Sequence, residues 1–434
     1  MGDNSGGVSR RDYLRGIGAA GAATGLAGCG FLNSATGGGG PDVYTMAATV
    51  PKSGEYSNLG PQIERGLELG NTFLKSEYFE DAELNLVLRD DESDPDTAAS
   101  QLESIQSEQD DDLNLVIGSY GNELSQAAAS FAEEQEVLCL TPFFPYAQPH
   151  RDSGYEYTFS IGAKSQSIAL STADNLDEFG ADERPSTVGI LERDDGWGTE
   201  MADAWETQLG EADGSYDVAL RETHEPGATD FGDLVSQASE AGVEVLLSNP
   251  GLESGVAIIE AMKSAGFAPT LTHLEWAANR PAWWSELGSD SEYVLSSPGW
   301  VPGTTGPGNA TLYEEYGNEY DLADDELVPP ATGTAYSLTY FLRFAFQGLD
   351  PFDQSEVIEN IRDTEIDTLW AQYNFDETTD GTVNGIPRAR GFAPPIGQWL
   401  TSEEFETGQR RVYPRGDSFY GAALQSPMPA WSER

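Results

Sequence analysis

Residues 43–88 contain three successive patterns from which the fold can be read. The segment VYTMAATV at residues 43–50 is rich in apolar and small side chains, which is typical of a buried strand. PQIERGLELGNTFLKSEY at residues 61–78 repeats its apolar side chains at helical spacing, and LNLVL at residues 84–88 is again typical of a strand. Strand, helix and strand in this order predict neighbouring parallel strands of an α/β sheet.

The same alternation continues along the chain in two sets. The first set adds strands at residues 113–117 and 137–140. The second set has strands at residues 187–191, 216–222, 243–247 and 270–274, with helical patterns between them. We therefore predict two α/β halves, each built on a doubly wound parallel sheet. Such sheets bind ligands beyond the carboxyl ends of their strands, which here are the loops at residues 51–60, 118–124, 141–148, 193–199 and 273–279.

The charge of the chain is strongly acidic. Its 434 residues include 22 Lys and Arg against 74 Asp and Glu, which gives a formal net charge of −52. A surface of this charge repels nucleic acid, which we exclude as a partner. It also predicts a protein of the halophilic type, because in molar salt a Debye length of roughly 3 Å screens self-repulsion. The alternative is an ordinary acidic protein.

The N-terminal residues have the pattern of an export signal. SRRDYLR at residues 9–15 resembles a twin-arginine signal, and the Gly/Ala-rich stretch that follows is too short for a spanning helix. LAGC at residues 26–29 resembles a lipobox, with Cys29 as the lipidated residue. We predict that residues 1–29 are a signal for twin-arginine export, that residues 30–41 are a flexible tether, and that the protein is anchored to the outer face of the cell membrane. The alternative is an unstructured tail with a chance arginine pair.

Short motifs along the remaining chain carry a family resemblance. They are PKSG at residues 51–54, DDESDP at 90–95, VIGS at 116–119, LTP at 140–142, DDGWG at 194–198, GATDF at 227–231 and AGF at 265–267. In this order and spacing, over about residues 42–400, the chain resembles the branched-chain amino acid (Leu/Ile/Val) and amide binding proteins of ABC importers.

The resemblance implies a type I periplasmic-binding-protein fold with two lobes joined by three crossovers. Residues 42–160 with 301–368 would form the first lobe, and residues 161–300 with 369–434 the second. The expected crossovers lie near Ser160, near residues 298–302 and near residues 367–373. The resemblance also implies a small-molecule ligand, ABC permease subunits as partners and no cofactor.

Six residues in the loops are candidates for ligand binding. They are Ser53, Asn122, Phe144 and Tyr146 from the first lobe, and Trp197 and Glu275 from the second. Glu275 falls where the amino acid binders of the family have a glutamate that faces the ligand's ammonium, and Trp197 falls where they have a tyrosine. Asn122 lies at a helix start, where the alternative is a helix cap.

The same loops depart from the family pattern in ways that bear on the ligand. Aromatic residues at 143–146 replace small ones, and Glu123 would repel an anion at the loop that usually meets a carboxylate. We therefore expect a neutral or amine-bearing ligand.

Catalysis and signalling are the two alternatives to a transport function. The sequence has no GxSxG, Walker or HExxH motif, so we predict neither an enzyme nor a metal site. The alternative that stays open is a ligand-sensing module of the same fold that acts in signalling rather than uptake. Asn309-Ala310-Thr311 is a glycosylation sequon, which is weak as a single match.

Overall fold

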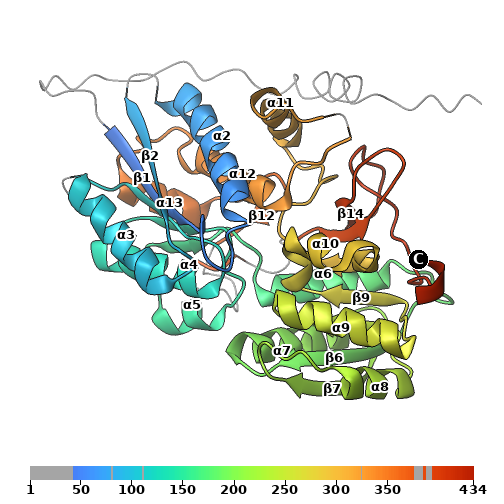
Figure 1. The fold of residues 1–434 in the computed structure, drawn as a ribbon. Coiled ribbons are helices and arrows are strands. Elements are labelled where there is room, and N and C mark those ends of the chain that lie inside the picture. Colours follow the sequence, from blue (N-terminus) through green and yellow to red (C-terminus); the bar gives the residue numbers. More distant parts are fainter. Residues whose placement is uncertain (1–42, 80–81, 110–111, 324, 376–384, 388–392) are drawn as a thin grey trace, which may run out of the picture.

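Two lobes make up the molecule (Figure 1). The computed structural model describes residues 43–434 apart from 80–81, 110–111, 324, 376–384 and 388–392. The predicted export signal, the tether and Cys29 therefore lie outside the described residues. Each lobe is a sheet flanked by helices, the first at the upper left of Figure 1 and the second at the lower right.

The first lobe contains a five-stranded parallel sheet with the order β2-β1-β3-β4-β5. Its strands are β1 (Val43–Val50), β2 (Glu83–Asp90), β3 (Leu115–Ile117), β4 (Cys139–Thr141) and β5 (Thr158–Ser160). Its helices are α2 (Gly60–Tyr78), α3 (Pro95–Glu108), α4 (Asn122–Gln135), α5 (Gln148–Ser153), α11 (Asn309–Glu319), α12 (Pro330–Ala345) and α13 (Gln354–Asp363). The predicted strand at residues 43–50 has the same bounds in the structure.

Alternation along β1 explains why helices cover both faces of this sheet. Met46 and Ala48 belong to one apolar cluster, which includes side chains of α2 and α12, whereas Ala47 belongs to another cluster with side chains of α3 and α4. Successive side chains of a strand point to opposite faces. A strand that is buried on both faces is therefore mostly apolar, and residues 43–50 include only two threonines among apolar and aromatic side chains.

Helices α2 and α12 pack closely because two glycines of α2 face α12. A Cβ at Gly66 would lie 2.4 Å from the Thr332 carbonyl oxygen, and one at Gly70 would lie 2.2 Å from the Thr339 side chain. Residues four apart share one face of a helix. The two glycines therefore form a flat strip that brings α12, which follows the second lobe in sequence, back onto the first.

The second lobe contains a seven-stranded sheet with the order β14-β13-β10-β9-β8-β6-β7. Its parallel strands are β6 (Thr187–Arg193), β7 (Asp217–His224), β8 (Val245–Ser248), β9 (Leu271–Leu274) and β10 (Val294–Ser296). Its helices are α6 (Ser165–Asp177), α7 (Gly196–Glu211), α8 (Gly232–Glu240), α9 (Leu252–Ala265) and α10 (Ala282–Leu287).

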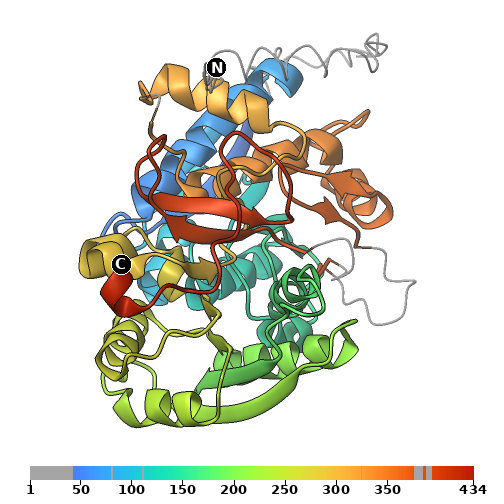
Figure 2. The same cartoon turned by 90° about the vertical axis from the view of Figure 1, so that its right-hand side faces the viewer.

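The sheet of the second lobe departs from the predicted all-parallel form at one edge. Strands β13 (Ile396–Leu400) and β14 (Gly408–Tyr413) form a hairpin, and β13 runs antiparallel to β10. The C-terminal segment that contains this hairpin lies across the level where the lobes meet (Figure 2, red). A short hairpin connection forces antiparallel pairing, because a parallel return needs a crossover of a dozen residues or more.

The chain passes between the lobes in three places. It leaves the first sheet after β5, returns after β10, and reaches β13 after the small pair β11 (Ile366–Asp367) and β12 (Gln372–Tyr373). These passages lie close to the three expected crossovers, while the lobe boundaries drawn on the sequence stay predictions. None of the helices in the described part of the chain has the length and apolar character needed to span a bilayer.

Candidate ligand-binding site

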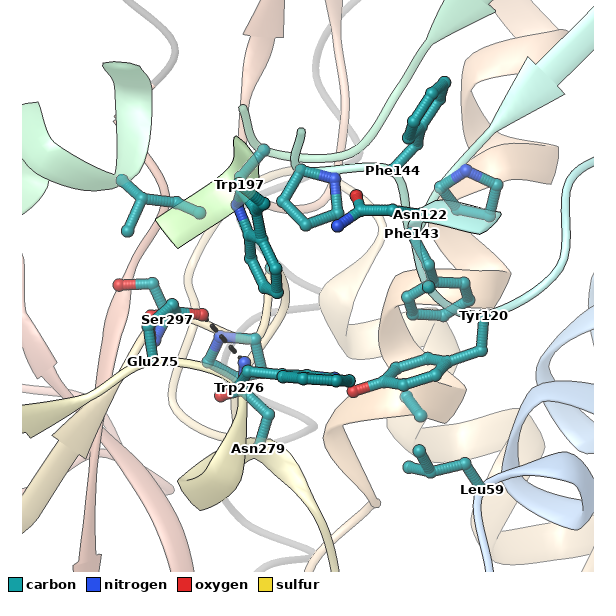
Figure 3. A pocket seen from close by; sticks show the side chains of 18 residues that line it. Leu59, Tyr120, Asn122, Phe143, Phe144, Trp197, Glu275, Trp276, Asn279 and Ser297 are labelled. Carbon is teal, nitrogen blue, oxygen red and sulfur yellow. Dashed lines mark hydrogen bonds between the residues drawn. The ribbon is translucent and has the colours of Figure 1, made fainter. Parts of the chain in front are cut away.

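A cavity of about 80 Å³ lies between the two lobes (Figure 3). Most of its lining residues follow β3, β4, β6, β9 and β10, at the carboxyl ends of parallel strands. That is where open α/β sheets place their ligands. A water molecule occupies about 10–15 Å³ on this measure, so the cavity has room for a small molecule. We call it the inner cavity.

The first lobe gives the inner cavity an almost wholly apolar wall. Tyr120 and Phe143 stand side by side with ring centroids 5.4 Å apart, and Leu59 and Pro142 also line this wall. Burial raises the pKa of Tyr120 to about 12, so its hydroxyl stays protonated at neutral pH. Besides Tyr120, this wall has a polar side chain in Asn122, whose Oδ1 accepts a hydrogen bond from the backbone N–H of Tyr146 at 2.9 Å.

The second lobe supplies most of the polar groups of the cavity wall. They belong to Trp197, Glu275, Asn279 and Ser297. Three of their atoms are buried and have no hydrogen-bond partner among the described residues: Trp197 Nε1, Asn279 Oδ1 and Ser297 Oγ. A buried polar atom without a partner costs free energy. These three atoms are buried within the wall rather than exposed to the cavity.

Glu275 is the buried charge of this wall, with 3% of its surface exposed. Its Oε2 accepts the backbone N–H of Ser297 at 2.8 Å and lies 2.9 Å from His273 Nε2, and its Oε1 accepts Asn279 Nδ2 at 2.7 Å. A carboxylate offers about four acceptor positions. Three are used within the protein, which leaves one for a ligand.

Trp276 closes the inner cavity on its outer side. Its φ of 69° and ψ of −58° are sterically unfavourable for a residue with a side chain. The Ala277 N–H donates to the Glu275 carbonyl at 2.8 Å, which completes a tight three-residue γ-turn. Strain of this kind persists where surrounding contacts impose it, and it concentrates at ligand sites.

Two arginines hold the indole of Trp276. The guanidinium carbons of Arg193 and Arg280 each lie 4.8 Å from its ring centroid, and Trp197 meets it edge-on at 5.5 Å. Arg280 also reaches the first lobe, where it lies over the Tyr56 ring and pairs with Glu55 at 3.0 Å. Trp276 is therefore fixed by contacts that join the lobes.

A larger cleft of about 600 Å³ lies beyond Trp276. We call it the outer cleft. It shares Tyr120, Gly121, Asn122, Trp197 and Trp276 with the inner cavity. Its other walls contain Arg193 and Arg280, each paired with a carboxylate (Arg193 with Asp195 at 2.5 Å), and the further carboxylates of Glu123 and Glu253.

The loop at residues 143–148 is held in place behind the cavity. Lys164 donates from Nζ to the carbonyls of Phe144 at 2.5 Å and Tyr146 at 3.3 Å, and burial lowers the pKa of Lys164 to about 7. Glu200 of the second lobe accepts the backbone N–H groups of Ala147 and Gln148, each at 2.8 Å. These bonds fix the turn that presents Phe143 to the cavity.

The structure brings only some of the predicted site residues to the inner cavity. Asn122, Trp197 and Glu275 line it with their side chains. Asn122 is the first residue of α4 rather than its cap, because Gly121 occupies the cap position with a φ of 94°. Phe144 belongs to the wall, but its ring points away from the cavity in Figure 3 and packs against Lys164.

Ser53 and Tyr146 lie away from the inner cavity. The Ser53 hydroxyl donates to Asp90 Oδ2 at 2.8 Å, which ties the first loop to the end of β2. Tyr146 lines a separate surface hollow, where its hydroxyl lies against Gly196. The sequon residue Asn309 is also buried, and its Nδ2 donates to two backbone carbonyls at 2.7 Å each.

The six predicted site residues leave out most of the lining of the inner cavity, including five residues that form its aromatic and polar walls. They are Tyr120, Phe143, Trp276, Asn279 and Ser297. Four of them lie within the predicted loops at residues 118–124, 141–148 and 273–279, so their place in the chain was predictable. The direction of each side chain was not. In the described part of the chain, no group of three or more His, Cys, Asp or Glu residues is arranged to hold a metal ion.

Comparison with protein families identifies the class to which this fold and site belong. A family model described as periplasmic binding protein matches residues 44–386. The chain therefore belongs to the periplasmic binding protein family, whose members are binding proteins rather than enzymes, and its fold is of type I.

Individual relatives are distant. A Leu/Ile/Val-binding protein homolog of Brucella abortus is 23% identical over 233 residues, which is 52% of this chain and 56% of that protein. The chain thus matches little more than half the length of these curated relatives. A leucine-binding protein of Thermotoga maritima superposes with a TM-score of 0.66 at 18% identity, covering 85% of this chain and 97% of the other.

Two further structures were solved with ligands. A branched-chain amino acid binding protein of Streptococcus pneumoniae in complex with isoleucine has a TM-score of 0.63 at 13% identity, covering 85% of this chain and all of the other. A solute-binding protein of R. palustris in complex with benzoate also has a TM-score of 0.63 at 13% identity, covering 89% and 97% of the two chains. At these identities the likeness establishes the fold alone.

Proposed function

We propose that this protein is the extracytoplasmic substrate-binding lipoprotein of an ABC importer, and that it captures a small neutral or amine-bearing solute between its lobes. The observation that carries the proposal is the inner cavity, which is enclosed by both lobes at the carboxyl ends of their strands. Only closure of the two lobes completes such a cavity, so ligand binding and closure are coupled. A permease can therefore distinguish the closed, solute-bound protein from the open one.

The chemistry of the cavity favours amines and amides. Its charged lining residue is a carboxylate, Glu275, and among the described residues that line it there is no Lys, Arg or His. A solute that donates N–H groups gains a charge-assisted hydrogen bond of roughly 1.5–3 kcal/mol there. The relatives solved with isoleucine and with benzoate show that this fold accepts both aliphatic and aromatic solutes.

A solute screen followed by an uptake measurement tests the proposal. Thermal shift in molar KCl would be measured with amino acids, amides, urea, aromatic acids and amines, and hits confirmed by calorimetry. We expect at least one neutral or amine-bearing hit, and we expect cells that lack the protein to lose uptake of that labelled solute. Normal uptake together with loss of a regulated response to the solute would favour the sensing alternative. A screen without any binder would contradict the proposal.

Anchoring through Cys29 has its own test. The twin-arginine pattern and LAGC at residues 26–29 support export followed by lipidation. Cys29→Ser should release the protein into the medium or leave it unprocessed, as detected by fractionation of cells. Unchanged membrane retention of the variant would exclude this anchor.

A further inference from the structure

The carboxylate of Glu200 joins the two lobes at a point outside the inner cavity. Glu200 belongs to α7 of the second lobe, and its two oxygens accept the backbone N–H groups of Ala147 and Gln148 of the first lobe, each at 2.8 Å. Arg151 of the first lobe lies 3.8 Å from Oε2, and the Ser165 hydroxyl of the second lobe donates to Oε1 at 2.6 Å. Hydrogen bonds to a carboxylate are stronger than bonds between neutral groups. A strong contact between the lobes therefore depends on one side chain.

The turn that Glu200 contacts has other supports, which do not depend on α7. The backbone N–H of Tyr146 donates to Asn122 Oδ1 within the first lobe, at 2.9 Å. Lys164, at the crossover that follows β5, donates to the carbonyls of Phe144 and Tyr146. If the second lobe swings away, these bonds can persist, whereas the N–H groups of residues 147 and 148 lose their acceptor to water. The turn is therefore a preformed partner for Glu200.

The same helix carries a side chain of the inner cavity. Trp197 lines that cavity and precedes Glu200 on α7 by three residues, so the two side chains lie on one side of the helix. The lobes also fit closely beside Trp197, because a Cβ at Gly196 would lie 2.2 Å from the hydroxyl oxygen of Tyr146. A movement that withdraws Trp197 from the cavity must also withdraw Glu200 from the turn. Closure of the cavity and formation of the Glu200 contacts are therefore one event.

We infer that Glu200 is a latch for the closed lobes, which strengthens solute binding by stabilising the closed form and does not touch the solute. Glu200 is not among the described residues that line the inner cavity. The inference rests on the proposed function and adds a control of affinity to the same site, because the apparent affinity of a solute rises with the fraction of protein that can hold it.

The latch should also work in concentrated salt. The side chain of Glu200 is 10% exposed, whereas that of Glu55 in the ion pair with Arg280 is 62% exposed. Salt screens buried charges much less than exposed ones. The latch is therefore the contact between the lobes that molar KCl should weaken less.

Glu200→Gln tests the latch, with Glu206→Gln as the matched control. Both variants remove one negative charge from α7, but Glu206 pairs with Arg221 of its own lobe, at 2.8 Å. The probe is the compound that binds most tightly in the thermal-shift screen of amino acids, amides, urea, aromatic acids and amines. In 3 M KCl we expect Glu200→Gln to bind this probe about tenfold more weakly by calorimetry, mainly through faster dissociation by stopped flow. Glu206→Gln should bind it as the parent does.

Hydrogen exchange distinguishes a latch from a permanent structural contact. Mass spectrometry of peptides that cover residues 144–152 would follow the N–H groups of Ala147 and Gln148 with and without the probe. In the parent and in Glu206→Gln, the probe should slow their exchange, because closure gives them an acceptor. In Glu200→Gln the probe should slow it much less.

A second variant keeps the test valid if the glutamine variant folds poorly. Glu200→Asp retains the charge and shortens the side chain by one methylene, so it should also lose the contact and weaken binding of the probe. The melting temperatures of the solute-free variants, compared with that of the parent, show which of them are folded.

The outcomes separate this inference from the proposed function. Glu200→Gln and Glu200→Asp that both bind the probe as tightly as the parent overturn the latch and leave the solute-binding proposal standing. Exchange at residues 147 and 148 that is equally slow with and without the probe also overturns it, because the contact would then be independent of the solute. If no compound binds the parent, both the inference and the proposed function fall.

Discussion

The inner cavity and the outer cleft share an aromatic partition and differ in charge. The cavity is small and mostly apolar and contains one buried carboxylate, whereas the cleft is larger and contains two arginines among several acids. In the cleft each arginine is paired with a carboxylate. The difference teaches that the positive groups of this site serve to hold the partition and join the lobes. The Glu275 carboxylate, which lies behind this partition, would then recognise the solute.

Removal of the partition should have the largest effect on binding. Trp276→Ala would merge the two spaces and expose the Glu275 end to water, so that the tightest solute of the screen binds roughly 30-fold more weakly, equivalent to about 2 kcal/mol. Calorimetry measures this, with Trp284→Ala on α10 as the control outside the cavity.

A second variant distinguishes the effect of losing the indole ring from the effect of relieving backbone strain at residue 276. Trp276→Gly loses the same ring but accepts a positive φ, so it should bind as weakly as the alanine variant while unfolding at a higher temperature. Unchanged affinity in both variants would contradict the view that Trp276 closes the cavity.

The thermal stability of the protein should depend on the salt concentration. A chain with a net charge of −52 repels itself in dilute buffer, and this repulsion is screened in molar KCl. We expect the thermal unfolding midpoint to rise by roughly 10 °C or more between 0.1 M and 3 M KCl. A flat midpoint would contradict the halophilic interpretation.

The ion pair between the lobes should have the smallest effect. Glu55→Gln and Arg280→Gln should each weaken solute binding about two- to fivefold in dilute salt, with a coupling of roughly 0.5–1 kcal/mol in the double variant. The coupling should shrink in 3 M KCl because the Glu55 carboxylate of this pair is exposed to solvent and its charge is screened.

The control for this pair is an ion pair within one lobe. Arg89 and Glu108, 2.7 Å apart, both belong to the first lobe, so neutralising them should leave solute affinity unchanged. Equal effects of the two pairs, or additive effects of Glu55→Gln and Arg280→Gln, would show that Glu55 and Arg280 do not stabilise the closed lobes together.

Most of the fold was predictable because the central strands of its sheets are buried on both faces. Such strands are runs of mostly apolar residues, as at residues 43–50 and 187–191, and their alternation with helices indicates a doubly wound sheet. The β13–β14 hairpin was not predictable in this way. Its buried positions include Gln398, Gln409 and Arg410, whose polar groups bond to backbone carbonyls such as those of Tyr293, Ala278 and Tyr420. Those partners are distant in sequence and leave no apolar pattern.

The site was predictable at the level of loops and not of side chains. Strand ends identified the loops, and the position of Glu275 placed a carboxylate in the cavity. Phe143 and Phe144 show the limit, since these neighbours have the same chemistry and their side chains have different surroundings. The Phe143 ring meets Tyr120 at the cavity, and the Phe144 ring packs against Lys164 and His150. The turn at residues 143–148 determines which of the two rings faces the cavity. Hydrogen bonds to Lys164 and Glu200 hold this turn, and no local sequence pattern reveals them.

A crystal structure of the protein with its tightest solute from the screen tests the central claim most directly. The account predicts density for the solute in the inner cavity, with its N–H donor within hydrogen-bond distance of Glu275 and Trp276 closed over it. Density for the solute in the outer cleft, with an anionic group against Arg193 or Arg280 and the inner cavity empty of solute, would contradict it.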